Sequence, residues 1–130
     1  MQSVTGVTAL DVYIAENNVR IVEIKDHPVT SEKTSLAKDT ANEILKESPG
    51  KDRVYLVAGY EIISPLDLSL VIEANGETIL STDEPRKKFE EPLLIRPMKD
   101  IVIKESHKNS TIPLKVKLTC TEYMFEAVRA

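Results

Sequence analysis

The sequence predicts a mainly β protein, a single antiparallel β-sandwich of jelly-roll-like form with about eight strands and one α-helix. Several short segments alternate apolar and polar residues, as strands do when they bury one face. The dipeptide Asn75-Gly76 separates two such segments and is the strongest short-range signal for a β-hairpin. Strands do not alternate with helices along the chain, which argues against a parallel sheet and for a sandwich or jelly roll.

The length and composition predict one globular domain. A chain of 130 residues buries roughly two thirds of its unfolded surface, so its core needs no disulfide or metal. Hydrophobic residues make up 42 % and charged residues 29 %, which excludes disorder throughout. With four Tyr, two Phe and no Trp, the core must be aliphatic. We expect one β-sandwich over residues 1–130, with residues 1–15 as an N-terminal arm or a first strand.

The charge and the apolar runs argue against several partners. The net charge is −4, and an acidic domain repels phosphate backbones, so we expect no nucleic-acid binding. The single cysteine, Cys120, allows neither an internal disulfide nor a cysteine-based zinc site. No run approaches the roughly 18 apolar residues of a membrane span, and the first residues lack the pattern of a signal peptide. We therefore expect a cytoplasm-like compartment and no contact with a membrane.

The N-terminal quarter predicts two strands and a turn. Leu10, Val12 and Ile14 would share one face of the first strand. Residues 16–18 form a turn, because asparagine tolerates positive φ better than most residues. Residues 19–25 alternate imperfectly and predict the second strand.

Residues 31–47 change period and predict the α-helix. Ser31 can cap its start, and Ser48-Pro49-Gly50 would stop it. The apolar stripe at helical spacing consists of Leu36, Ala37, Ala41, Ile44 and Leu45. Because this stripe is narrow, the helix is expected to cover a sheet edge or an end of the sandwich.

Residues 52–82 are the centre of the predicted sandwich. A strand over residues 54–60 contains Gly59, which indicates a bulge or a close approach of another backbone. After the break at Ser64-Pro65, a strand over residues 68–72 leads into the hairpin turn. Residues 77–82 are its returning partner.

The C-terminal part predicts a polar loop followed by three strands. The loop covers residues 83–88, and short strands follow at residues 93–95 and 101–103. A second loop covers residues 107–111. Residues 114–120 alternate most clearly, so their even positions should face the core and their odd positions water or a partner.

The residues offer no catalytic constellation. His27 and His107 each lie in a polar, turn-like segment, where a histidine is usually a solvated surface group and less often a ligand or base. Cys120 lies on the apolar face of a strand, where it should act as a small buried hydrophobe. No nucleophile-elbow motif surrounds a serine, and the glycines form no phosphate-binding loop. We therefore expect no enzyme activity, no catalytic residue, no cofactor and no metal.

The charged clusters are interpreted as solvated surface. Neighbours on a strand point to opposite faces, so Glu90-Glu91 would not converge on one substrate, and Asp83-Glu84 is interpreted as a solvated loop or rim. The run Arg86-Lys87-Lys88 is too short, and too closely balanced by these acids, for a nucleic-acid patch.

Large apolar side chains gather in two stretches that need an explanation. Burial in the core and a subunit contact both explain them, since aromatic residues and Met are enriched at interface cores. The residues concerned are Tyr60, Ile62, Ile63, Tyr123, Met124 and Phe125.

The order of four motifs resembles the small capsid decoration, or cement, proteins of tailed bacteriophages. The motifs are Ser64-Pro65, Asn75-Gly76, Pro92-Leu93-Leu94, and Val116-x-Leu118 running up to Tyr123. The resemblance covers residues 54–123, and the expected helix at 31–47 departs from its simplest members.

The resemblance implies a jelly-roll-like homotrimer on the exterior of a virion, where it would bind the major capsid protein and stabilise the shell. The chain is too small for a typical shell-forming subunit, and its acidic charge suits the outside of a shell. Residues 3–9 are then a candidate arm that pairs with a partner's sheet edge.

Two other classes of protein remain as alternatives. The first is a non-viral β-sandwich module that binds protein or carbohydrate, although the absence of Trp disfavours stacking on sugars. The second is a cupin-like metal enzyme, which two histidines far apart in the sequence disfavour.

Overall fold

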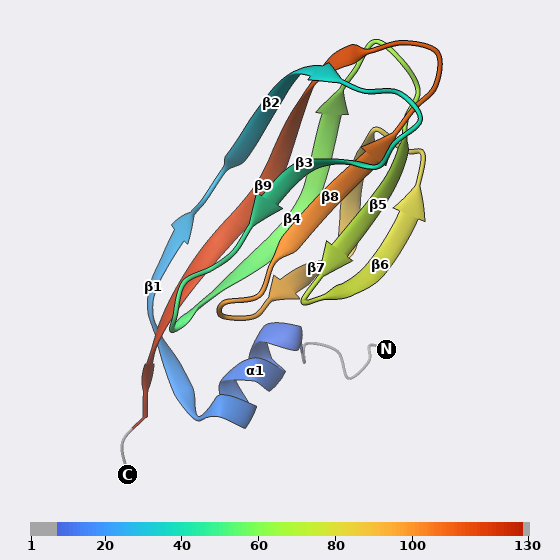
Figure 1. Ribbon diagram of the computed structural model, residues 1–130. Helices are drawn as coiled ribbons and strands as arrows, with labels where there is room; N and C mark the ends of the chain where they lie inside the picture. Colours follow the sequence, from blue (N-terminus) through green and yellow to red (C-terminus); the bar gives the residue numbers. More distant parts are fainter. Residues whose placement is uncertain (1–7, 129–130) are drawn as a thin grey trace.

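The computed structural model describes residues 8–128, which fold as two antiparallel sheets packed face to face with one helix at their end (Figure 1). The predicted fold class, a mainly β antiparallel sandwich, is confirmed. The elements are α1 (Ala9–Asn17), β1 (Val19–Asp26), β2 (Val29–Leu36), β3 (Asn42–Glu47), β4 (Arg53–Ile63), β5 (Ser69–Ala74), β6 (Glu77–Thr82), β7 (Arg86–Ile95), β8 (Ile101–Ser106) and β9 (Ile112–Ala127).

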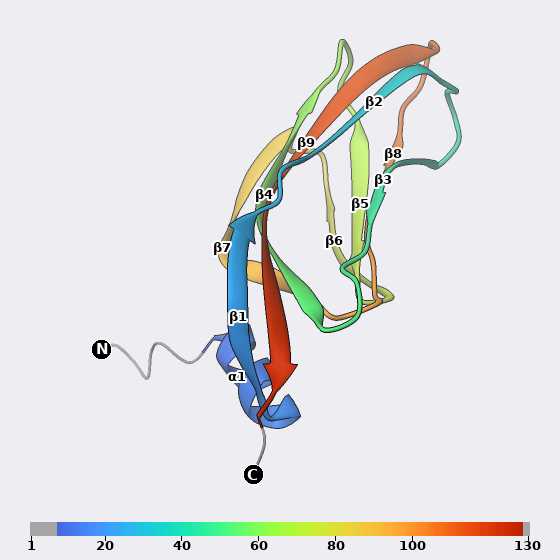
Figure 2. The same ribbon diagram turned by 90° about the vertical axis from the view of Figure 1, so that its left-hand side faces the viewer.

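The strands pair in a nested order, from the central hairpin outward to the two ends of the described chain. The β9 sheet has the order β1-β9-β4-β7, with β2 also paired to β9, and the β8 sheet has the order β3-β8-β5-β6. β5 pairs with β6, β4 with β7, β3 with β8, and β1 and β2 together with β9, and successive pairs alternate between the two sheets. This is the strand order of a jelly roll. In Figure 2 the β9 sheet lies on the left and the β8 sheet on the right.

The predicted hairpin lies at the centre of this nesting. Asn75 and Gly76 have φ of 55° and 84°, the positive values that a tight two-residue hairpin turn needs. The Asn75 side chain also donates to the carbonyl of Leu94 at 2.8 Å and accepts from the backbone N–H of Arg96 at 2.8 Å. The turn therefore joins the β8 sheet to the end of β7 in the other sheet.

The core between the sheets is aliphatic, as the composition predicted. Isoleucine and leucine dominate it, and the even positions of β9 point inward as expected. Its most completely buried side chains include Ile44, Val57, Leu70, Ile72, Ile95, Ile101, Ile103 and Val116.

The helix predicted at residues 31–47 is wrong. These residues form β2, which pairs with β9, and β3, which pairs with β8. The apparent helical stripe has two sources: Ala37 and Ala41 lie in the exposed loop between the strands, and a bulge places both Ile44 and Leu45 in the core. Pairing with two long neighbouring strands overrides the local spacing.

The first strand predicted at residues 10–14 is also wrong, because this segment is helix α1. Thr8 Oγ1 accepts from the Asp11 backbone N–H at 3.1 Å, and the Asp11 carboxylate accepts from the Thr8 N–H at 3.0 Å, a capping box. Asn18 ends the helix with φ of 49°, the positive value expected of an asparagine in the predicted turn, whereas residues 16 and 17 of that turn are the end of the helix. Residues 1–7, which include most of the candidate arm at residues 3–9, lie outside the described residues.

The predicted loop at 83–88 ends earlier than expected, and the strand after it is longer. β7 begins at Arg86 and runs through Pro92. A proline is tolerated there because β7 is an edge strand, and residues 89–92 fall between the paired residues Lys88 and Leu93.

Gly59 marks the bulge that the sequence indicated. The pairing of β4 shifts between Val57 and Gly59 against both of its neighbours. A Cβ atom at Gly59 would lie 2.3 Å from the backbone oxygen of Lys87, so only glycine lets β4 and β7 approach this closely.

Candidate interaction surface

Strand β1 is an edge of the β9 sheet and exposes most of its apolar side chains. It forms a ribbon with the C-terminal half of β9, and no strand of the described chain pairs with its other edge (Figure 2). Ile21, Val22 and Ile24 are 36 %, 48 % and 56 % exposed, and no side chain of β1 is buried. An edge strand with exposed aliphatic residues is a template for another protein chain.

A bulge at Val22 brings the two isoleucines of β1 onto one face. Ile21 lies opposite Phe125 and Ile24 opposite Tyr123, with one extra residue on β1 between the pairs. Directly opposed residues share a face of a sheet, and Phe125 and Tyr123 point away from the core. The outer face of the ribbon therefore carries an apolar row.

Helix α1 covers the part of this outer face beside β1. The rings of Tyr13 and Phe125 lie 5.4 Å apart, and Phe125 is 4 % exposed. Val54, which lies opposite Tyr123 and outside the main core cluster, is fully buried. The helix thus closes one side of the apolar patch and leaves Ile21 and Ile24 uncovered.

The structure divides the predicted interface residues into two groups. Tyr60, Ile62 and Phe125 are 3 %, 5 % and 4 % exposed, so burial within this chain explains them and takes them out of reach of a surface partner. Ile63 is 53 % exposed, and Tyr123 and Met124 are half-buried. These latter three stay predicted contacts. The exposed aliphatic residues of β1 were missed, although the imperfect alternation of residues 19–25 was their signal.

His107 is not the solvated surface group that the sequence predicted. Its side chain is fully buried, and its Nδ1 lies 2.8 Å from the Glu105 carboxylate, which is buried as well. Its Nε2 donates to the carbonyl of Ser110 at 2.8 Å, and Asn42 Nδ2 donates to Glu105 at 2.6 Å. The prediction failed because residues two apart on a strand share a face, so Glu105 turns inward together with His107.

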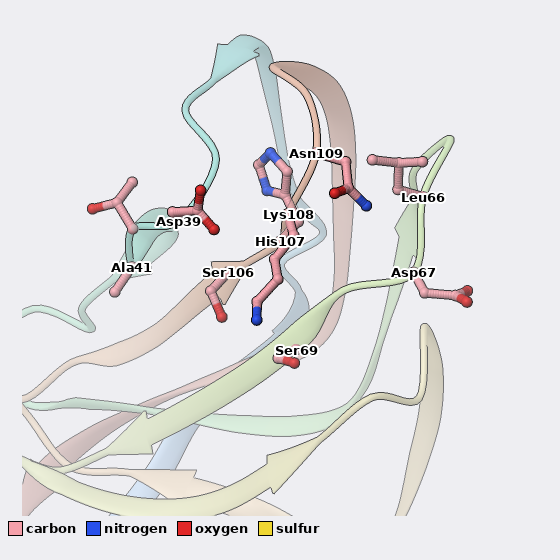
Figure 3. A pocket seen from close by; sticks show the side chains of 10 residues that line it. Asp39, Ala41, Leu66, Asp67, Ser69, Ser106, His107, Lys108 and Asn109 are labelled. Atoms are coloured by element: carbon pink, nitrogen blue, oxygen red, sulfur yellow. The ribbon is translucent and has the colours of Figure 1, made fainter.

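An open cavity of about 730 Å³ lies beside this pair, at the loop end of the sandwich (Figure 3). The Asp67 side chain points away from the other residues that line it, and Asp39 lies on the opposite side. Both ring nitrogens of His107 are engaged in hydrogen bonds, so the cavity has no histidine free to act as a base.

We expect the stability of the protein to fall as the pH rises past neutrality. The hydrogen bond with Glu105, partly offset by burial, raises the pKa of His107 above its ordinary 6.5. A raised pKa in the folded state stabilises fully below the unfolded value and loses this effect as the pH passes the folded value. Urea unfolding between about pH 6 and about pH 9 should show the loss, and His107→Gln should flatten the profile. A wild-type profile as flat as that of the variant would contradict this.

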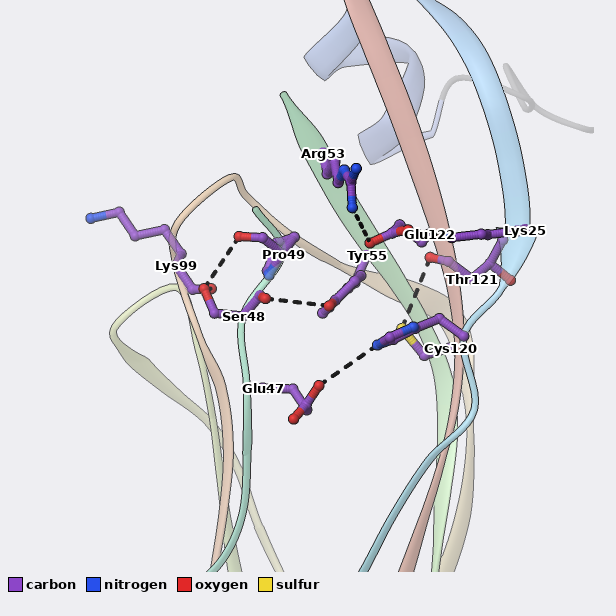
Figure 4. Close-up of polar contacts among 11 residues, drawn as sticks. Lys25, Glu47, Ser48, Pro49, Arg53, Tyr55, Lys99, Cys120, Thr121 and Glu122 are labelled. Atoms are coloured by element: carbon purple, nitrogen blue, oxygen red, sulfur yellow. Dashed lines mark hydrogen bonds and ion pairs between the residues drawn. The ribbon is translucent and has the colours of Figure 1, made fainter. Parts of the chain in front are cut away.

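A second polar cluster, around the buried Glu122, lies on the C-terminal half of β9 (Figure 4). Glu122 is buried, with Lys25 Nζ at 3.4 Å and Arg53 Nη1 at 3.7 Å. His27 is half-buried and stacks on Tyr55 at 4.9 Å between ring centroids. These contacts hold the junction of β1 and β2 against β4 and β9.

Cys120 is buried, as predicted. Burial, assisted by Glu122 and Glu47, raises the pKa of the thiol to about 12, so it stays protonated and unreactive at neutral pH. Among residues 8–128, no group of three or more His, Cys, Asp or Glu side chains could hold a metal ion. Glu90 and Glu91 are exposed on β7.

Comparison with known proteins gives no family for the chain. No protein-family model and no curated protein matches it. No helix in the described part of the chain is long and apolar enough to cross a membrane. Function is therefore argued from the fold and from the surfaces that the fold exposes.

Proposed function

We propose that this protein is a capsid decoration, or cement, protein that binds the outer surface of a viral shell and stabilises it without catalysis. The observation that carries the proposal is β1, a sheet edge that exposes three aliphatic side chains in four consecutive positions. The resemblance of residues 54–123 to cement proteins and the jelly-roll strand order support it.

The β1 edge suits a protein partner for energetic reasons. Covering the exposed parts of Ile21, Val22 and Ile24 contributes on the order of 1 kcal/mol each. A strand added at this edge also pairs the backbone groups of β1, so a short contact gains both hydrogen bonds and apolar burial. The partners proposed are two further copies of this chain, in a homotrimer, and the major capsid protein on the virion exterior.

The runner-up function, a carbohydrate-binding module, has less support. Tyr55 and Tyr60 are 4 % and 3 % exposed, which leaves Tyr13 and Tyr123 as the half-exposed tyrosines of the described chain. Tyr13 packs on Phe125, so the described residues do not form a flat aromatic platform for sugar rings. A non-viral protein-binding module would use the same β1 edge and is separated from the cement function by the capsid test.

The proposal is tested by co-sedimentation. The genes that neighbour this one are searched for a shell-forming protein. Empty shells assembled from it are mixed with the purified chain, whose mass in solution is measured by sedimentation velocity. A trimer that pellets with the shells and raises their temperature of disassembly is the expected result. A monomer that remains in the supernatant would overturn the proposal.

Ile24→Lys should weaken assembly at least about tenfold while changing the free energy of unfolding by no more than about 0.5 kcal/mol. Ile24 is 56 % exposed, so the fold does not depend on it, but a lysine there places a charge in the contact. Ile79→Lys is the matched control, because Ile79 is 39 % exposed on β6, one of the two edge strands of the other sheet. Equal effects of the two variants would place the contact elsewhere.

A further inference from the structure

We propose that the outer face of the β9 sheet carries a docking groove for an extended, acidic segment of a partner protein. The groove lies over β4, β7 and β9, and no residue of helix α1 lines it. This inference does not depend on the partner being a capsid.

The register places the groove's long side chains on one face. Lys88 lies opposite Gly59, which lies opposite Thr119 on β9. Two residues further along β4, Glu61 lies between Arg86 and Lys117. Since the even residues of β9 point into the core, Lys117 and Thr119 stand on the outer face. Cations from β7 and β9 therefore flank a shared floor.

The groove is open above its floor because the residues that form the floor are small. Gly59 has no side chain and cannot gain one, since a Cβ there would meet the Lys87 carbonyl oxygen at 2.3 Å. Ala58 and Thr119 complete the floor of an open cavity of about 530 Å³. The bulge that lets β4 approach β7 thus also forms the trough between Lys88 and Lys117.

The groove is positive although the chain is acidic. Arg86 is paired with Glu61 at 2.7 Å and Lys87 with Glu84 at 3.8 Å. Lys88 and Lys117 are exposed, and no carboxylate of the described chain lies within ion-pair distance of either. Two uncompensated cations on one short trough, in a chain of net charge −4, favour a partner that brings its own carboxylates.

A second hollow of about 510 Å³ lies further along the same face, and the ion pair of Lys115 with Glu32 is part of its lining. Ile63, 53 % exposed, lies opposite Lys115, two residues along from the Glu61–Lys117 pair. Pro65 and Pro113 line this hollow as well. The occupant that fits both hollows is an extended segment with an aliphatic residue beside acidic ones, because alternate side chains of such a segment point the same way.

A nucleic acid fits this surface less well. Phosphate backbones are held by many cations in a row, and their binding is opposed by a negative net charge. Two free lysines on a short trough suffice for a peptide of a few acidic residues. Binding of DNA is therefore an outcome that the experiment has to distinguish.

The test is fluorescence anisotropy with a labelled peptide of about eight residues, acidic with one central leucine. We expect saturable binding that weakens about tenfold in the Lys88→Glu/Lys117→Glu variant and also in high salt. The control is Lys38→Glu/Lys51→Glu, which reverses two exposed lysines in the β2–β3 and β3–β4 loops and changes the net charge equally. Circular dichroism verifies that both variants fold.

Three results would overturn the proposal. These are no binding by the wild type, equal weakening by both double variants, and binding of a double-stranded DNA oligonucleotide as tight as that of the peptide. The Ile24→Lys variant should bind the peptide as the wild type does. A wild-type chain that binds the peptide but does not pellet with the shells would reject the cement function and leave the groove intact.

Discussion

Gly59→Ala should destabilise the fold by at least about 3 kcal/mol. The new Cβ would lie 2.3 Å from the Lys87 backbone oxygen and 3.1 Å from the Lys88 Cα, and backbone atoms cannot swing aside as a flexible side chain can. β4 and β7 would have to separate at the bulge, which breaks the pairing that holds the edge strand β7 in the β9 sheet. Urea unfolding followed by circular dichroism measures the loss.

Gly50→Ala is the matched control. A Cβ at Gly50 would meet nothing closer than the Arg53 Cδ at 3.8 Å, an ordinary van der Waals contact, and Gly50 does not have positive φ. We expect this variant to unfold within about 0.5 kcal/mol of the wild type. Similar losses in the two variants would show that the close approach of β4 and β7 is not what requires glycine.

Glu105→Ala should cost about 3 kcal/mol of stability. The carboxylate is 1 % exposed and accepts from Asn42, with His107 Nδ1 at 2.8 Å. Its removal leaves an imidazole and an amide without partners in a buried place. Because Asn42 also donates to the carbonyl of Ala37, the loop between β2 and β3 loses its anchor. Urea unfolding gives the energy, and proteolysis within residues 37–41 and 107–111 gives the site of loosening.

Two further variants test whether the network accounts for this loss. Glu105→Gln keeps one acceptor oxygen and should lose less than the alanine variant. Glu43→Ala, on the same side of the molecule in β3 but exposed, should be within about 0.5 kcal/mol of the wild type. If Glu105→Ala were as mild as Glu43→Ala, the buried pair would contribute nothing to holding the loops.

The alternation of residues predicted the strands that face the core on one side. β4, β5 and β9 follow a two-residue period over most of their length, and Asn75-Gly76 joins β5 to β6 as expected. In a half-buried strand, apolar and polar residues alternate along the sequence, so the strand can be found without knowledge of its partners.

The elements that were mispredicted depend on distant partners. Residues 31–47 have alanines and leucines at helical spacing, yet β9 and β8 supply the hydrogen bonds that make them strands. Residues 10–14 alternate like a strand, but Asp11 within this segment and Thr8 just before it make a capping box that starts a helix. The spacing of apolar residues along the chain cannot show whether local helix capping or pairing with distant strands decides the structure of a segment.

The candidate functional residues were also predicted correctly only where local alternation determines their burial. Cys120 was correctly predicted as buried, because its strand alternates cleanly. His107 was mispredicted because its partner Glu105 is charged and looked like a solvated residue. The groove was invisible in the sequence, where Arg86-Lys87-Lys88 appeared balanced by nearby acids. Lys117 joins it from a strand that is adjacent only in the folded sheet.

The nested strand pairing has a consequence for how the chain folds. Ala74 and Glu77, which flank the central turn, are neighbours in sequence, whereas Val19 pairs with Ala127 at the other end of the nest. Loop-closure entropy makes the inner hairpin the natural nucleus and the outermost pair the last to close, with folding in milliseconds to seconds typical of such topologies. Strand β1 is therefore expected to pair last. Chaperones and other copies of this chain would meet its exposed aliphatic residues before the sandwich is complete.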